Sequence, residues 1–150
     1  MSNQDLEPTI ASLPRITRED LSEILTNSSS PTIPSNIAII DVRDSDHIGG
    51  HIRGSTWVPS SELDFKTPEL VRQLKDKETV VFHCALSQVR GPKAALGYLR
   101  ERRRLGGGKK GKKEQRVVVL EGGFTKWQEK YGEDKRLTEG YQKDIWEFGY

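Results

Sequence analysis

Residues 79–93 read TVVFHCALSQVRGPK, and the order of residue types in this stretch decides the fold. The apolar run at residues 80–82 predicts a short strand that is buried on both faces, as in parallel sheets. A polar loop follows, and Pro92 is typical of the first turn of a helix. The only cysteine of the chain, Cys84, stands where the strand passes into the loop, and Arg90 closes the loop six positions later. The stretch therefore predicts a strand, a tight loop and a helix, with a thiol and a guanidinium at the two ends of the loop.

The rest of the chain alternates between short apolar runs and amphipathic segments. Further strands are predicted at residues 37–41, 56–59 and 117–120. Helices are predicted after an N-cap at Thr17, from Thr67-Pro68, from Pro92 to about residue 103, and around Trp127 and Tyr131. Buried strands that alternate with helices are typical of an α/β sandwich. We expect a mainly parallel central sheet with helices on both faces.

The 150 residues suit one compact domain with polar attachments at both ends. We expect residues 1–14 to form an N-terminal arm, residues 15–131 to form the domain, and residues 132–150 to form a tail that packs on it. Four apolar residues support that packing: Tyr141, Ile145, Trp146 and Phe148. No signal peptide, membrane span or intramolecular disulfide is expected, because the start is polar, apolar runs are short and there is one cysteine. The sequence favours a monomer in the cytoplasm, with the nucleus as the alternative.

The net charge of +2 conceals a strong local imbalance. Residues 100–116 contain nine Lys or Arg against two Glu, and residues 105–115 within them read as a basic Gly/Lys loop. Three interpretations stay open: a solvated insertion without a function, a nuclear import signal, and a docking patch for acidic phosphoproteins. Binding to nucleic acid is not expected, because no aromatic residues interleave with the charges.

The loop after Cys84 has the features of an oxyanion site. Ligands of parallel sheets bind beyond the carboxyl ends of the strands, and loop amides at a helix N-terminus attract anions. Arg90 adds a planar fork for two oxygens. The same field lowers a thiol pKa from about 8.5 to ~3.5–7.5. We therefore predict nucleophilic attack by a Cys84 thiolate on a bound phosphoryl group, with a thiophosphate intermediate. The predicted substrate-binding residues are Ala85, Leu86, Ser87, Gln88 and Val89, with Ser87 near the sulfur and Gln88 orienting water.

Residues 83–92 (HCALSQVRGP) resemble the active-site loop of rhodanese-fold enzymes. The resemblance is to the cell-division-cycle-25 (M-phase inducer) phosphatases and the yeast-type arsenate reductases, and most of all to small single-domain fungal phosphatases. Three further segments are similar: DVR at 41–43, GGHI at 49–52, and LEGGF at 120–124. The likeness covers about residues 15–131 and implies a rhodanese-like sandwich with Cys84 as nucleophile and Arg90 as anion binder.

Loop length separates the branches of this family. Sulfur-transferring members have four residues between the cysteine and the arginine, whereas five separate Cys84 from Arg90 here. The wider loop favours a tetrahedral anion, either in a phosphorylated protein or as a small oxyanion. A tyrosine or dual-specificity phosphatase is favoured, and a glutathione-dependent arsenate reductase is the alternative. A third hypothesis is a non-catalytic phosphate-binding module. The presence of both Cys84 and Arg90 argues against it.

Two departures from the resembling family affect the predicted site. M-phase inducers carry acidic residues in this loop, where Ala85 and Val89 stand here, so the candidate proton donors become Asp44 and Asp46 in the neighbouring corner. Those relatives protect the nucleophile with a second cysteine, which is absent here, so an external thiol such as glutathione must reduce an oxidised Cys84. Asp41 and His83 are predicted to support the loop. No metal is expected, because His47 and His51 lack metal-ligand spacing with other ligands. No resident cofactor is expected either.

Overall fold

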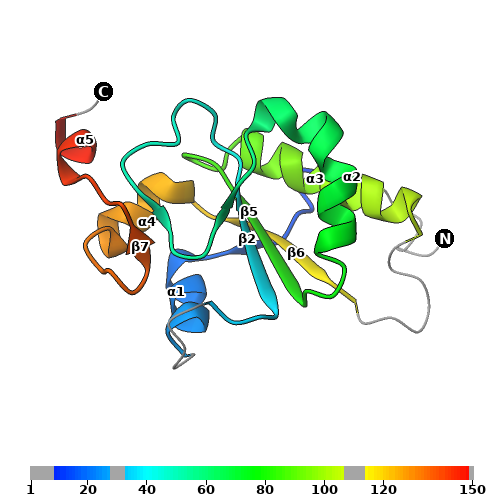
Figure 1. The fold of residues 1–150 in the computed structure, drawn as a ribbon, viewed down its shortest axis with the longest axis horizontal. Coiled ribbons are helices and arrows are strands. Elements are labelled where there is room, and N and C mark those ends of the chain that lie inside the picture. Colours follow the sequence, from blue (N-terminus) through cyan, green and yellow to red (C-terminus); the bar gives the residue numbers. More distant parts are fainter. Residues whose placement is uncertain (1–8, 28–32, 107–113, 149–150) are drawn as a thin grey trace.

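The computed structural model describes residues 9–27, 33–106 and 114–148 (Figure 1). The predicted basic loop at 105–115 and the start of the N-terminal arm lie largely outside these residues. The strands are β1 (Arg15–Ile16), β2 (Ile37–Asp41), β3 (His51–Ile52), β4 (Thr56–Trp57), β5 (Thr79–His83), β6 (Arg116–Leu120) and β7 (Thr138–Glu139). The helices are α1 (Arg18–Thr26), α2 (Leu63–Gln73), α3 (Arg90–Arg104), α4 (Gly123–Tyr131) and α5 (Lys143–Phe148).

Five strands form one parallel sheet in the order β1-β6-β5-β2-β4. The three long strands β6, β5 and β2 lie side by side at its centre, and their carboxyl ends therefore meet at one edge. A separate antiparallel pair joins β3 to β7. The predicted α/β sandwich with a parallel central sheet is confirmed.

The side chains of the central strands point alternately to the two faces of the sheet and are buried in two separate hydrophobic cores. Val80 and Phe82 point to the face covered by α2 and α3, where Ala95 and Tyr98 are buried. Val81 points to the opposite face, which α1 and α4 cover with residues such as Leu21, Phe124 and Trp127. Figure 1 shows these two helical layers on either side of the sheet. Both faces are buried, which explains why the strand sequences are continuous apolar runs.

The predicted start of the second helix at Thr67-Pro68 is wrong. The helix α2 begins at Leu63, directly after a 3-10 turn at Ser60–Glu62, and contains Pro68. Pro68 removes only the hydrogen bond that Asp64 would receive, and the Thr67 hydroxyl donates to the Leu63 carbonyl at 2.6 Å. Pro68 is thus accommodated inside α2, and the 3-10 turn before Leu63 determines where the helix begins.

Both ends of the described chain pack on the domain. Leu13 of the predicted arm is buried in the α2–α3 core, and β1, which no sequence pattern indicated, pairs with β6. In the tail, Trp146 packs against the opposite core and its Nε1 donates to the Gly49 carbonyl at 2.9 Å. Phe148 is 82% exposed, so the prediction that it helps to dock the tail is wrong. In the described part of the chain, no helix has the length and apolar character needed to cross a membrane.

Candidate active site

Cys84 lies at the carboxyl end of β5, between β2 and β6, at the base of the loop that leads into α3. Its side chain is 3% exposed. The sulfur accepts hydrogen bonds from the backbone N–H of Ser87 at 3.2 Å and of Gly91 at 3.4 Å. Gly91 belongs to the first turn of α3, where unpaired N–H groups and the helix dipole favour negative charge. Two backbone N–H donors therefore converge on the sulfur, and one of them lies at the positive end of the α3 dipole.

Ser87 closes the loop by adopting a left-handed backbone. Its φ is +57°, and it is the only described residue other than glycine with a positive φ. The buried Ser87 hydroxyl accepts a hydrogen bond from the Cys84 backbone N–H at 3.3 Å. The Ser87 carbonyl accepts from Arg15 of β1 at 3.1 Å. Ser87 thus reaches the sulfur through its backbone N–H, whereas its side chain fixes the curl of the loop.

The first residues of α4 form hydrogen bonds with the loop that begins at Cys84. The backbone N–H of Phe124 donates to the Cys84 carbonyl at 3.0 Å, and that of Thr125 donates to the Ala85 carbonyl at 2.8 Å. Gly123 has a φ of +59°, and a Cβ placed there would overlap both of these carbonyl oxygens. The glycine at position 123 is therefore what permits the loop and α4 to approach so closely.

We predict that Gly123→Ala destabilises the protein by at least about 2 kcal/mol, because a left-handed alanine costs ~1–2 kcal/mol before any overlap is relieved. Gly97→Ala is the matched control, because a Cβ at Gly97 of α3 meets no atom within 4 Å. That control is expected to be neutral or up to about 1 kcal/mol stabilising. Urea unfolding of both variants measures the difference, and equal midpoints would refute the close approach.

Asp41, Arg43 and His83 form a buried polar platform beside the loop, and all three are fully buried. The Arg43 side chain donates to both Asp41 oxygens, with Nη2 at 2.7 Å from Oδ2. Burial opposes ionisation of Asp41, but the electrostatic influence of the neighbouring His83, followed by the hydrogen bonds and charge of Arg43, outweighs it and holds the pKa of Asp41 below its usual value. Arg43 also donates to the Gly50 carbonyl at 2.9 Å and so ties the next segment to the platform.

His83 connects this platform to the nucleophile. Its Nδ1 lies 3.1 Å from the Cys84 carbonyl, and its Nε2 lies 3.8 Å from Asp41 Oδ2. Burial lowers the pKa of His83, which favours a neutral ring that donates from Nδ1 to that carbonyl. In this tautomer Nε2 carries no proton, in agreement with its lack of a hydrogen-bond partner in the described structure. His83 thus contacts the backbone at Cys84 directly, whereas Asp41 holds the Arg43 side chain beside it.

Arg90 is held by the two predicted proton donors. Its Nη1 and Nη2 donate to the two carboxylate oxygens of Asp46 at 2.8 and 2.6 Å, and Nη1 lies 3.4 Å from Asp44. The hydrogen bonds from Arg90 lower the pKa of Asp46 to about 2. Burial opposes ionisation of Asp44, but hydrogen bonds from Ser60, Ser61 and Arg90 lower its pKa as well. Both carboxyls are thus ionised at neutral pH, which is the opposite of what a general acid requires.

The remaining loop side chains form an exposed rim. Leu86 is 48% and Val89 66% exposed, Gln88 is also exposed, and Ala85 is half-buried. The hydrogen-bond donors at the sulfur are instead two backbone N–H groups, those of Ser87 and Gly91. Arg43 and Gly123 lie in the DVR and LEGGF segments that resemble the family, but the sequence predicted no separate role for either. Arg15 carried no sequence signal.

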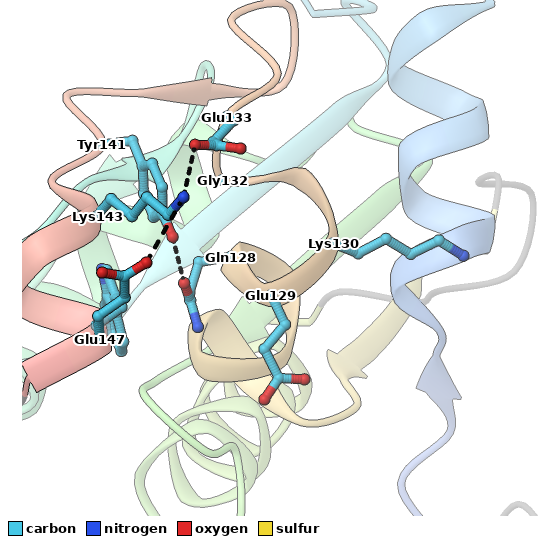
Figure 2. Close-up of a pocket in the computed structure, with 9 residues that line it drawn as sticks. Gln128, Glu129, Lys130, Gly132, Glu133, Tyr141, Lys143 and Glu147 are labelled. Carbon is cyan, nitrogen blue, oxygen red and sulfur yellow. Dashed lines mark hydrogen bonds and ion pairs between the residues drawn. The ribbon is translucent and has the colours of Figure 1, made fainter.

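Outside the loop, two features of the described residues concern ligand binding. In the described residues, no three His, Cys, Asp or Glu side chains converge as a metal site needs. An open hollow of about 460 Å³ lies between α4 and the tail, at the end of α4 far from Cys84. Figure 2 shows Lys143 of α5 between Glu133 and Glu147, 3.5 Å from each, and Tyr141 donating to Gln128. These contacts pair several of the polar groups that line the hollow with one another.

The chain is similar in sequence to known proteins along most of its length. Residues 18–130 match the family model of the rhodanese-like domain. Over 131 residues the chain is 38% identical to the CDC25-like phosphatase YCH1 of Saccharomyces cerevisiae, which covers 77% of this chain and 81% of that protein. It is 43% identical over 93 residues to arsenate reductase 2.2 of Oryza sativa subsp. japonica, covering 61% of this chain and 69% of that protein.

A solved structure agrees with these sequence matches. Ygr203w, described as a yeast protein tyrosine phosphatase of the rhodanese family, superimposes with a TM-score of 0.70 and is 32% identical. The superposition covers 89% of this chain and 96% of Ygr203w.

Proposed function

This chain belongs to the rhodanese-like domain family, and from that premise we propose that it is a cysteine-based phosphatase of the tyrosine or dual-specificity type. Its substrates are phosphorylated proteins, and Cys84 is the nucleophile. The predicted resemblance to the CDC25-like phosphatases and the arsenate reductases is confirmed by the relatives of both kinds. The phosphatase route needs no cofactor.

One observation carries the proposal: the Cys84 sulfur accepts two backbone N–H groups at the base of a loop that ends in Arg90. A buried sulfur that serves only as an apolar side chain does not need two N–H donors. N–H groups in these positions would also stabilise negative charge on the sulfur and on an oxyanion bound above it, and Arg90 begins the helix at the end of the same loop. Five residues between Cys84 and Arg90 make the loop wide enough for a tetrahedral anion.

The proposed reaction has two steps. The Cys84 thiolate attacks phosphorus, so that an S–P bond forms while the bond from phosphorus to the ester oxygen breaks. The ester oxygen leaves as an anion, such as a phenolate, and takes up a proton from water. Water then attacks phosphorus, the S–P bond breaks, and inorganic phosphate and the thiolate are released. Arg90 and the loop amides stabilise the charge on the non-bridging oxygens in both steps.

Arsenate reduction is a second candidate, favoured by the lone cysteine and by the similarity to a rice arsenate reductase. Here the thiolate attacks arsenic(V), water leaves, and a glutathione thiolate then attacks the Cys84 sulfur. The electron pair of the S–As bond passes to arsenic, which departs as arsenite, and a Cys84–glutathione disulfide forms. A second glutathione reduces that disulfide and restores Cys84. No second protein cysteine is required.

A matched pair of assays on the same preparation tests these functions. We expect release of phosphate from an aryl phosphate, a suitable probe because a phenolate leaves without a proton donor and both candidate acids are ionised. Arsenite formation with glutathione is measured in parallel, under the same buffer conditions. Phosphate release at a rate well above arsenite formation supports the phosphatase. Glutathione-dependent arsenite formation with negligible phosphate release would reverse the order of the two candidates.

A further inference from the structure

Arg90 and Asp46 form a bidentate ion pair, although Arg90 is the side chain that is expected to bind the anionic substrate. Asp46 takes the terminal edge of the guanidinium, with one oxygen on Nη1 and the other on Nη2. Asp44 approaches the same Nη1 from outside. The hydrogen bonds to Asp46 raise the pKa of Arg90, and the nearby Cys84 sulfur contributes in the same direction. The guanidinium is thus paired along its terminal edge with Asp46 and, at longer distance, with Asp44.

Some N–H groups of the Arg90 guanidinium remain available to a ligand. A guanidinium has five N–H groups. Two are directed at Asp46 and one at Asp44, which leaves the N–H of Nε and the second N–H of Nη2. Within the described residues, Arg90 Nε makes no hydrogen bond. These two N–H groups lie parallel along one side of the guanidinium, in the fork that binds two oxygens of a phosphate or arsenate.

The two aspartates are themselves fixed in place. Asp44 accepts hydrogen bonds from the Ser60 hydroxyl and, at 3.1 Å, from the Ser61 backbone N–H. Asp46 accepts the Asp44 backbone N–H at 2.9 Å, in addition to Arg90. Carboxylates held in this way form a rigid support, so the orientation of the guanidinium is set before any anion arrives.

We propose that Asp46 is a positioning residue, which holds the terminal edge of Arg90 with help from Asp44 so that the Nε–Nη2 edge faces the oxyanion above Cys84. This inference rests on the proposed function, because it concerns the same anion site. It gives the two aspartates a role other than proton donation. It also explains why a negative side chain is placed beside a site for negative substrates.

The sign of one affinity change tests the proposal. Removing a negative charge near an anion site should tighten binding if electrostatic repulsion alone operates. If Asp46 positions Arg90, its removal should weaken binding, by about tenfold, the scale on which outer-shell hydrogen bonds tune an ion site. The probe is inorganic arsenate, titrated calorimetrically into Cys84→Ser and into Cys84→Ser/Asp46→Asn. The asparagine retains an oxygen for the Asp44 N–H, so the local turn is preserved.

Two further variants sharpen the comparison. Asp134→Asn removes the same charge from a bidentate pair with Arg136, after the end of α4 far from Cys84, and should leave arsenate affinity unchanged within twofold. Asp44→Asn breaks the longer contact of 3.4 Å and should weaken binding less than Asp46→Asn does. It also replaces Asp46→Asn in the comparison if that variant does not fold.

Each outcome has a defined meaning. Weaker binding by Asp46→Asn, together with a lower kcat/KM in the protein that retains Cys84, supports the positioning role. Equal or tighter binding overturns it, while arsenate binding to Cys84→Ser leaves the proposed function standing. If Cys84→Ser itself binds no arsenate, the oxyanion site and the proposed function fail, and the positioning role fails with them.

Discussion

Cys84→Ser is expected to hydrolyse an aryl phosphate about 10⁴-fold or more slowly than the wild type, while its fold is retained. The loss is large because the serine hydroxyl is un-ionised at neutral pH, whereas the thiolate is the attacking group in the proposed reaction. The two N–H donors at the sulfur position, from Ser87 and Gly91, remain available to a serine oxygen. Initial rates at saturating substrate measure the effect.

The accompanying control is thermal unfolding, because an inactive protein that has unfolded says nothing about the nucleophile. We expect the midpoint of Cys84→Ser to lie within a few degrees of the wild type, since the substitution is nearly isosteric. A folded variant that keeps more than about 1% of the wild-type rate would show that another group attacks phosphorus. The same variant must also lose arsenite formation, because both candidate reactions begin at Cys84.

Arg90→Lys should lower kcat/KM by about 10²–10³-fold although the positive charge is retained. A lysine offers a point charge on a flexible stem, so it cannot hold Asp46 and two oxygens of the substrate at once. The predicted loss appears in kcat as well as KM, since charge on the non-bridging oxygens is stabilised most in the transition state. Steady-state kinetics with an aryl phosphate separates the two parameters.

Arg136→Lys is the matched control for that substitution. Arg136 makes a comparable bidentate pair, with Nε and Nη2 at 3.1 and 2.8 Å from Asp134, but lies on the turn after α4. It should retain the wild-type kcat/KM. If Arg90→Lys likewise keeps more than a tenth of kcat/KM, the planar fork is not what binds the substrate.

Continuous apolar runs made most of the sheet predictable from the sequence. The runs at 37–41 and 117–120 correspond to β2 and β6, because a strand that is buried on both faces consists mainly of apolar residues. The strand β1 was missed, since two residues carry no periodic pattern. The start of α2 was misplaced because a Thr-Pro pair resembles a helix cap even where it lies inside a helix, as Thr67 and Pro68 do in α2.

The chemistry of the site was less predictable than its location. The positions of Cys84 and Arg90 at the ends of one loop follow from the strand-loop-helix pattern. The pairing of Arg90 with Asp46 spans 44 positions in the chain and arises only when β2 and β5 lie side by side. The carboxylates that looked like proton donors in isolation are therefore stabilised as anions by a partner that the sequence does not place beside them.

The contacts between α4 and the nucleophile loop bear on the order in which the protein matures during synthesis. Cys84 leaves the ribosome about 40 residues before Phe124 and Thr125, whose N–H groups hold the carbonyls of Cys84 and Ala85. During that interval β6 is also missing from the sheet, although it lies directly beside β5. Long-range parallel pairing of this kind forms late in folding. A nascent chain that already displays its cysteine thus has no complete oxyanion cradle, and competence for catalysis arises only after the last third of the polypeptide has folded onto the first two.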